Sequence, residues 1–136
     1  MASTLGNIAL WISLFFVILQ FFSNLIKDTN LLLKFHSIAV IGLLLGSLIS
    51  FFSLMYSHVV SDFTVVNVFQ NSHTTKPLIY KISGVWGNHE GSMLLWILVL
   101  TTFNYFIFKF YNEKNYSFIS KTLETQAFII IGFILF

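Results

Sequence analysis

The chain has 136 residues, of which 57% are hydrophobic and only 9% are charged. A water-soluble core of this size could not bury so much apolar surface, so the composition indicates an integral membrane protein covered by lipid. All basic residues are lysines, and the net charge of +2 is too small and too scattered to indicate nucleic-acid binding. Cysteine is absent, which excludes disulfides, thiolate metal ligands and a thiol nucleophile.

Three apolar runs are long enough to form complete membrane spans, which we expect at 8–26, 35–57 and 93–110. The first two runs correspond to roughly 28 and 34 Å of helix, about the thickness of the hydrocarbon layer. The first run could alternatively be a signal peptide. No positively charged segment precedes it and no small-residue cleavage site follows it, so we interpret it as a retained span.

A fourth apolar run begins near Leu123 and continues to Phe136. From Ala127 onward it would form roughly 15 Å of helix, which is too short to cross a bilayer. This predicts a partial span at 123–136, as in a split or truncated gene product. The expected fold is therefore all-α: a single membrane domain, 1–136, with three transmembrane helices, a truncated fourth, and a long outer-face loop between helices 2 and 3.

The polar connection at 58–91 is that loop. Its segment DFTVVNVFQNS, from Asp62 to Ser72, has a polar side and predicts a short helix on the membrane surface with Asp62 as its cap, although its β-branched residues also permit a strand. Pro77 is expected to end regular structure there. Tyr80 and Trp86 are the kinds of ring found at the level of lipid headgroups.

Lysine is denser in the short connections near Lys27–Lys34 and Lys109–Lys121 than in the amino terminus or the loop 58–91. By the positive-inside rule, those short connections face the cytoplasm or mitochondrial matrix. The amino terminus and the loop 58–91 are then expected on the outer side.

Small residues recur at helical spacing in the second span and predict a close helix contact: Gly42, Gly46, Ser50 and Ser53. Trp11 and Trp96 are expected to pack inside the bundle. His36 is expected among lipid headgroups or as a cap of a neighbouring helix. The outer-side histidines have no metal-binding spacing, so no metal site is predicted from them: His58, His73 and His89.

The start of the third span carries the residues with the most chemistry. Gly91 or Ser92 is expected to cap the helix, and Glu90 complements the positive end of its dipole. Alternatively, the helix start, with Trp86 and His89 beside it, offers a platform for an anionic group. No hydrolase, phosphate-loop or dinucleotide motif and no catalytic carboxylate pair occurs in the sequence.

Three stretches resemble one protein family: LGNIAL (5–10), DFTVVNVFQNS (62–72) and KPLIYKISGVWGNHEGSMLLW (76–96). They are similar to the amino-terminal part of the CcmF family, the haem lyase subunits of the system I cytochrome c maturation pathway. The resemblance covers about a third of the chain. Its core, VWGNHEGSMLLW, mixes polar and aromatic residues in an order that membrane composition alone rarely produces.

The resemblance implies a protein of the bacterial or mitochondrial inner membrane that handles haem. Its implied partners are the remainder of CcmF, the haem chaperone CcmE, a CcmH-type protein and apocytochrome c. The family's tryptophan-rich outer loop is absent here, and its haem-ligating histidines belong to parts of the family beyond this chain.

The resemblance further implies a supporting role beside the haem loop, and no catalytic role, for six residues: Trp86, Gly87, His89, Glu90, Gly91 and Ser92. The anionic group at the helix start would be a haem propionate. This piece would belong to a holocytochrome c synthase complex without being catalytic alone. The alternatives are a non-catalytic assembly or scaffold subunit of an inner-membrane respiratory complex, and a gene fragment without function.

Overall fold

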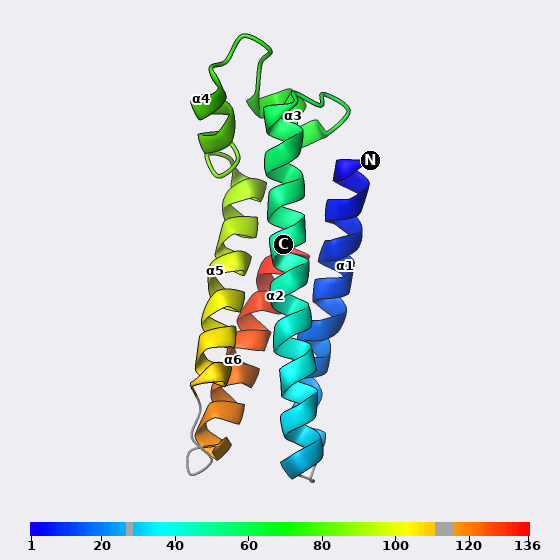
Figure 1. Ribbon diagram of the computed structural model, residues 1–136, viewed down its shortest axis with the longest axis vertical. Coiled ribbons are helices and arrows are strands. Elements are labelled where there is room, and N and C mark those ends of the chain that lie inside the picture. Colours follow the sequence, from blue (N-terminus) through cyan, green and yellow to red (C-terminus); the bar gives the residue numbers. More distant parts are fainter. Residues whose placement is uncertain (27–28, 111–115) are drawn as a thin grey trace.

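Four long helices stand side by side in the computed structural model, which describes residues 1–26, 29–110 and 116–136 (Figure 1). They are α1 (Ala2–Phe21), α2 (Thr29–Val59), α5 (His89–Lys109) and α6 (Tyr116–Leu135). All four are long and apolar enough to cross a membrane. Over the described ranges there is no strand, so the all-helical membrane architecture predicted from the sequence is confirmed.

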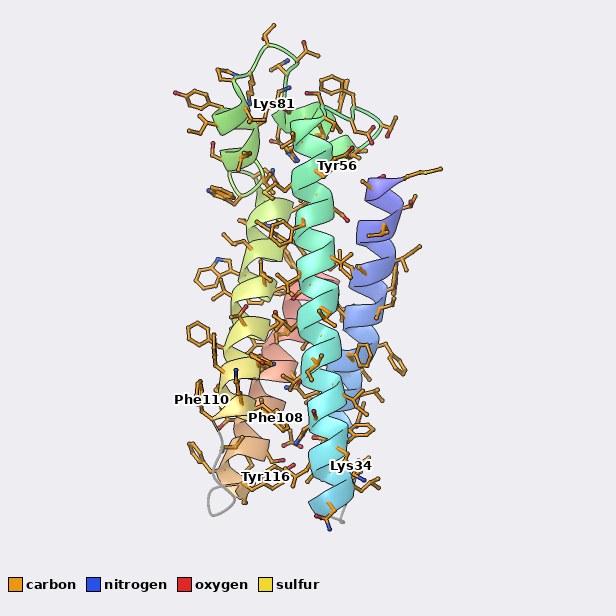
Figure 2. All side chains as sticks on the ribbon, viewed as in Figure 1. Lys34, Tyr56, Lys81, Phe108, Phe110 and Tyr116 are labelled. Carbon is orange, nitrogen blue, oxygen red and sulfur yellow. The ribbon has the colours of Figure 1, made fainter. Side chains whose placement is uncertain are left out.

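Two short helices, α3 (Val66–Asn71) and α4 (Leu78–Ser83), lie at the end of the bundle where the chain begins (Figure 1). At the opposite end, a short 3-10 helix, η1 (Phe22–Leu25), follows α1. Lys34 and Tyr116 are near that second end and Lys81 is near the first (Figure 2). The bundle therefore has one end with the amino terminus, α3 and α4, and another with η1, the start of α2 and the start of α6.

The helices extend beyond the apolar runs that predicted them. α1 begins six residues before the expected span at Ile8, and α2 has 31 residues where 23 were expected. Hydropathy detects the lipid-facing part of a helix, whereas the backbone hydrogen bonds continue into polar residues at its ends. In the loop, Pro77 lies between α3 and α4 and is the N-cap of α4, where its fixed φ is compatible with a helix start.

The fourth helix differs most from expectation. α6 has 20 residues, as many as α1, and starts at Tyr116, seven positions before the predicted partial span at Leu123. Its extra residues include Ser117, Ser120 and Lys121, and these polar side chains are the reason that a polar connection was predicted there. The expected count of three spans plus a truncated fourth is therefore not confirmed, because α6 also meets the length and composition of a span.

The predicted stripe of small residues lies where α1 and α2 pack together. Ser50 Oγ donates a hydrogen bond of 3.0 Å to the carbonyl oxygen of Gly6. A Cβ at Gly42 would lie 2.5 Å from the ring of Phe16, and one at Gly46 would overlap Ser13 Oγ. Small side chains let the two backbones approach this closely, so the predicted helix contact is confirmed.

Polar side chains link the helices inside the bundle. Ser47 on α2 and Thr101 on α5 share a hydrogen bond of 2.8 Å between their hydroxyl oxygens. His36 is fully buried, and its two ring nitrogens lie 2.8 Å from Ser23 Oγ and 2.8 Å from the hydroxyl of Tyr116. The prediction that His36 lies among headgroups or caps a helix was wrong, because neighbouring helices supply partners for both of its nitrogens.

Large apolar side chains cover the outside of the bundle. Trp11 and Trp96 are 67% and 56% exposed, so the expectation that they pack inside was wrong. Many phenylalanines and isoleucines on the same helices are also exposed, whereas the interior combines aliphatic side chains such as Leu43 and Ile130 with buried serines and Thr101. Apolar outer faces of this kind are typical of helices that contact lipid or further transmembrane segments.

Candidate functional site

Two asparagines join the loop to the start of α5. Asn67 Nδ2 lies 2.9 Å from Asn88 Oδ1, and Asn88 Nδ2 lies 3.2 Å from Asn67 Oδ1. Each amide therefore both donates to and accepts from the other. Asn88 Nδ2 also donates to the carbonyl oxygens of Gly84 at 3.0 Å and Val85 at 3.3 Å. This network attaches α3 and the turn after α4 to α5.

Asn88 is the N-cap of α5. Its Oδ1 accepts a 2.8 Å hydrogen bond from the backbone N–H of Gly91, as expected for an asparagine cap. The predicted caps, Gly91 and Ser92, lie inside the first turn instead, and Ser92 Oγ donates to the carbonyl oxygen of His89 at 2.8 Å. A Cβ on Gly91 would overlap the carbonyl oxygen of Val85, so this position has no room for a side chain.

Glu90 lies in the first turn of α5, where its charge complements the helix dipole as predicted. Its Oε2 accepts a hydrogen bond from Asn67 Nδ2, so the carboxylate belongs to the same network as the two asparagines. Within the described residues, no lysine or histidine forms a salt bridge with it. The helix start therefore presents a negative carboxylate, which disfavours an anionic ligand there.

The other predicted site residues lie around this network. Trp86 is 43% exposed. Gly87 is exposed too, and a Cβ there would meet only ordinary contacts, the nearest 3.5 Å away at Ser83 O. The ring of His89 packs against Phe136, which follows α6, with centroids 5.4 Å apart. The structure thus brings Glu90 and Gly91 into the hydrogen-bonded network of Asn67 and Asn88, whereas Trp86 and His89 lie beside that network. We call the segment from Trp86 to Ser92 the corner.

Asp62 does not cap α3, although the sequence predicted that it would. Its Oδ1 accepts hydrogen bonds from Thr64 Oγ1 at 2.6 Å and Thr64 N at 3.2 Å, so it stabilises the turn before α3. The hydrogen bonds from Thr64 lower the pKa of Asp62. Ser61, one residue earlier, has φ of 56°, and Lys81 Nζ donates to its Oγ at 2.6 Å. α4 is thereby tied to the end of α2.

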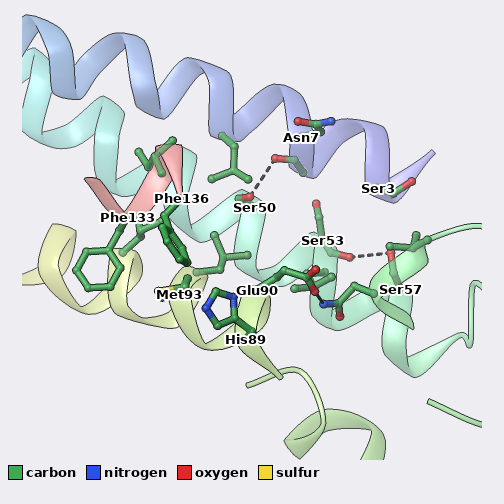
Figure 3. Close-up of a pocket in the computed structure, with 18 residues that line it drawn as sticks. Ser3, Asn7, Ser50, Ser53, Ser57, His89, Glu90, Met93, Phe133 and Phe136 are labelled. Atoms are coloured by element: carbon green, nitrogen blue, oxygen red, sulfur yellow. Dashed lines mark hydrogen bonds between the residues drawn. The ribbon is translucent and has the colours of Figure 1, made fainter. Parts of the chain in front are cut away.

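A cavity of about 300 Å³ lies beside the corner, between α1, α2, α5 and α6 (Figure 3). Its polar walls include Asn7, Asn67, His89, Glu90 and the hydroxyl groups of several serines. Its deeper lining is apolar and comes from four helices: Leu10, Leu54, Met93, Leu94, Ile97, Phe133, Ile134 and Phe136. An apolar cavity with a few convergent polar groups has the form of a ligand site.

Asn67 and Asn88 belong to the site but were not among the site residues predicted from the sequence. Both were inside the stretches quoted for the resemblance, and Asn88 directly precedes the helical run with an acid two residues later. The preference for asparagine at N-caps could therefore have identified Asn88. Its pairing with Asn67, 21 residues away, depends on how α3 packs and has no local sequence signal.

Comparisons with known proteins give a consistent result. The chain is 43% identical over 135 residues to a cytochrome c-type biogenesis protein CycK of Bradyrhizobium diazoefficiens, which covers 96% of the chain. A cytochrome c-type biogenesis protein CcmF of Haemophilus influenzae is 37% identical over 70% of the chain. A solved structure of cytochrome c heme lyase CcmF matches with a TM-score of 0.86 and 26% identity over 98% of the chain. The chain belongs to the CcmF family.

The chain matches only a portion of CcmF-type proteins. It covers 20% of the Bradyrhizobium relative, 15% of the Haemophilus relative and 23% of the solved CcmF chain. No model of a known protein family matches it. None of the relatives named here is a subunit of a respiratory complex, so the alternative interpretation as such a subunit has no support from them.

Nothing in the described residues shows a haem site, although the buried Nε2 of His58 has no hydrogen-bond partner among them. They contain no group of three or more His, Asp or Glu side chains that could hold a metal ion. Both ring nitrogens of His36 have hydrogen-bond partners, and His58 is fully buried with Nδ1 3.1 Å from the carbonyl oxygen of Leu54. His89 is the histidine at the cavity, but Glu90 beside it disfavours haem propionates.

Proposed function

We propose that this chain is the amino-terminal part of a CcmF-type haem lyase and helps to present haem for attachment to apocytochrome c. The observation that carries the proposal is its similarity, over nearly its whole length, to a cytochrome c-type biogenesis protein. The fold similarity to a cytochrome c heme lyase supports it independently. In such a lyase, bound haem supplies vinyl groups that become joined to cysteine thiols of the apocytochrome.

In this proposal the corner from Trp86 to Ser92 supports a haem-binding loop contributed by the rest of the protein. Asn88 caps α5 and, through Asn67, fixes the corner to α3, so the corner is a rigid platform. Trp86 and Gly87 are exposed on it and are available to contact another segment. The chain's own residues thus position the platform, and the haem ligands and catalytic groups come from the remainder.

We further propose that residues 1–136 form one membrane domain whose α3 and α4 end faces the periplasm or intermembrane space. The support is that Lys34, near the start of α2, lies at the opposite end of the bundle from Lys81 on α4 (Figure 2), whereas Lys27 and Lys114 of the two lysine-rich connections lie outside the described residues. Lysine-rich connections are retained on the cytoplasmic or matrix side. The outer end would then face the partners proposed for this pathway: the remainder of CcmF, CcmE, a CcmH-type protein and apocytochrome c.

The test is co-production of the chain with the remainder of CcmF and haem staining of cytochrome c. Deletion of residues 86–92 should lower staining severalfold while the chain remains in the membrane. Asn88→Ala should lower it less, because the capped corner is loosened but not removed. The matched control, Gln70→Ala, changes an exposed residue of α3 and should leave staining unchanged. Normal staining after the deletion would refute the platform role.

A further inference from the structure

The cavity beside the corner combines an acidic rim with an apolar interior. Glu90 is at its rim, in the first turn of α5, and has one carboxylate oxygen bonded to Asn67. Ile97 lines the cavity two turns further along α5, about 10 Å deeper along the helix axis. α5 begins at His89 and is long and apolar enough to span a membrane, so in a spanning arrangement Glu90 would lie at the headgroup layer and Ile97 within the hydrocarbon.

A second hollow continues from this cavity along the outer surface of α5 and α6. It has a volume of about 250 Å³ and shares Met93, Phe133 and Phe136 with the first. Gly132 lines it, and a Cβ at Gly132 would meet no other atom within 4 Å. The two hollows thus adjoin at Met93, Phe133 and Phe136, and an apolar path past these side chains would lead from the acidic rim to the outward-facing groove over Gly132.

We infer that the cavity binds a membrane lipid whose headgroup carries a primary ammonium group. The ammonium group would pair with the Glu90 carboxylate, which has no salt-bridge partner among the described residues. One acyl chain would follow the apolar path and leave through the groove over Gly132. The cavity is at the small end of the usual range for ligand sites, so it suits part of a lipid rather than a whole one.

Charge and position select this occupant. The cavity has no lysine among its lining residues, so an anionic headgroup would meet the Glu90 carboxylate with no lysine to balance the charge, and only His89, the asparagines and the serine hydroxyls could donate hydrogen bonds to it. A quaternary ammonium group could approach Glu90 but has no N–H to donate to it or to the amide oxygen of Asn67. An ammonium group with three N–H donors satisfies both the charge and the hydrogen-bonding capacity of the rim. This inference does not depend on the proposed role in haem attachment.

The experiment uses the chain in membranes together with its partner polypeptides. The probes are phosphatidylethanolamine and phosphatidylcholine, each with a photoreactive diazirine on one acyl chain, and labelled peptides are identified by mass spectrometry. The ethanolamine lipid should label peptides containing Met93 and Gly132 about threefold to fivefold more than the choline lipid, the ratio expected of a partly exposed ion pair. Equal labelling by both lipids, or labelling confined to Trp11 and Trp96, would overturn the inference.

Three variants separate specific binding from general lipid contact. Glu90→Gln should reduce labelling by the ethanolamine lipid to the level of the choline lipid. Asp62→Asn removes an acid at the same end of the bundle but outside the cavity, and it should preserve the preference. Gly132→Phe fills the groove on an exposed helix face and should reduce labelling by both lipids. If Glu90→Gln retains the preference, or if crosslinks to another polypeptide replace the lipid label, the site does not hold this lipid.

Discussion

Asn67 on α3 and Asn88 at the start of α5 exchange two side-chain hydrogen bonds, 2.9 and 3.2 Å long, although they are 21 residues apart in sequence. The same Asn88 side chain caps α5 through Gly91 N. One residue therefore fixes both the start of a membrane helix and the path of the loop that precedes it.

The first prediction concerns this pair. Asn88→Ala removes the cap and leaves the amide of Asn67 without its main partner, so it should destabilise the fold by about 1–3 kcal/mol. Thermal unfolding in mild detergent, together with protease sensitivity of the loop, would measure the loss. Gln70→Ala removes an exposed amide side chain of α3 and serves as the control. An equal effect of the two substitutions would show that the pair contributes nothing specific.

The second prediction uses two glycines with opposite surroundings. Gly91→Ala places a Cβ onto the carbonyl oxygen of Val85 and should destabilise the fold by about 1–3 kcal/mol. Gly132→Ala meets no atom within 4 Å, and alanine's higher helix propensity should leave stability unchanged or raise it by less than about 1 kcal/mol. Comparing the unfolding temperatures of the two variants tests whether Gly91 is required by packing rather than by helix propensity.

The sequence predicted three of the four long apolar helices, because a span needs a long apolar run wherever it packs, but it predicted only the second part of α6. It also predicted the contact made by Gly42 and Gly46, since small residues at helical spacing have few other roles in lipid. His36, Trp11 and Trp96 were misplaced for one reason. Whether a helix face points inward depends on the neighbouring helices. When a helix is apolar on nearly every side, its sequence carries no pattern that distinguishes the inward face from the outward face.

The candidate site was predicted only in part, for a similar reason. Glu90 and Gly91 are next to the start of an apolar run, so local rules for helix ends indicated them. Asn67 belongs to another element, and its contact with Asn88 arises only when the chain brings α3 to the start of α5. The cavity beside Glu90 has walls from five helices and could not be read from any one segment.

The third prediction tests the buried histidine. His36→Leu leaves the hydroxyl groups of Ser23 and Tyr116 without the imidazole partner and should destabilise the bundle by about 1–3 kcal/mol. Unfolding by a denaturing detergent would report the change. The control, His73→Leu, replaces an exposed histidine of the loop and should have little effect. If the two histidine variants unfold alike, the hydrogen bonds of His36 do not stabilise the fold.

The fourth prediction concerns the hydrogen bond between Ser47 and Thr101, which joins α2 and α5 inside the apolar bundle. A double-mutant cycle with Ser47→Ala and Thr101→Val should give a coupling of about 0.6 kcal/mol, the average for such bonds in a membrane protein. Valine keeps the shape of threonine, so the cycle isolates the hydroxyl groups. Strictly additive effects in the cycle would mean that this bond adds no stability.

The fifth prediction concerns how the bundle crosses the membrane. Because the chain has no cysteine, single cysteines can be introduced without a background signal. Thr74→Cys places one in the loop between α3 and α4, and Lys121→Cys places one near the start of α6, toward the other end of the bundle (Figure 1). In sealed vesicles with the outer face exposed, a membrane-impermeant maleimide should label the first at once and the second only after the membrane is opened. Labelling of both cysteines from one side would mean that α5 and the start of α6 do not carry the chain across the bilayer. That result would also refute the proposed outer position of the segment around Asn88.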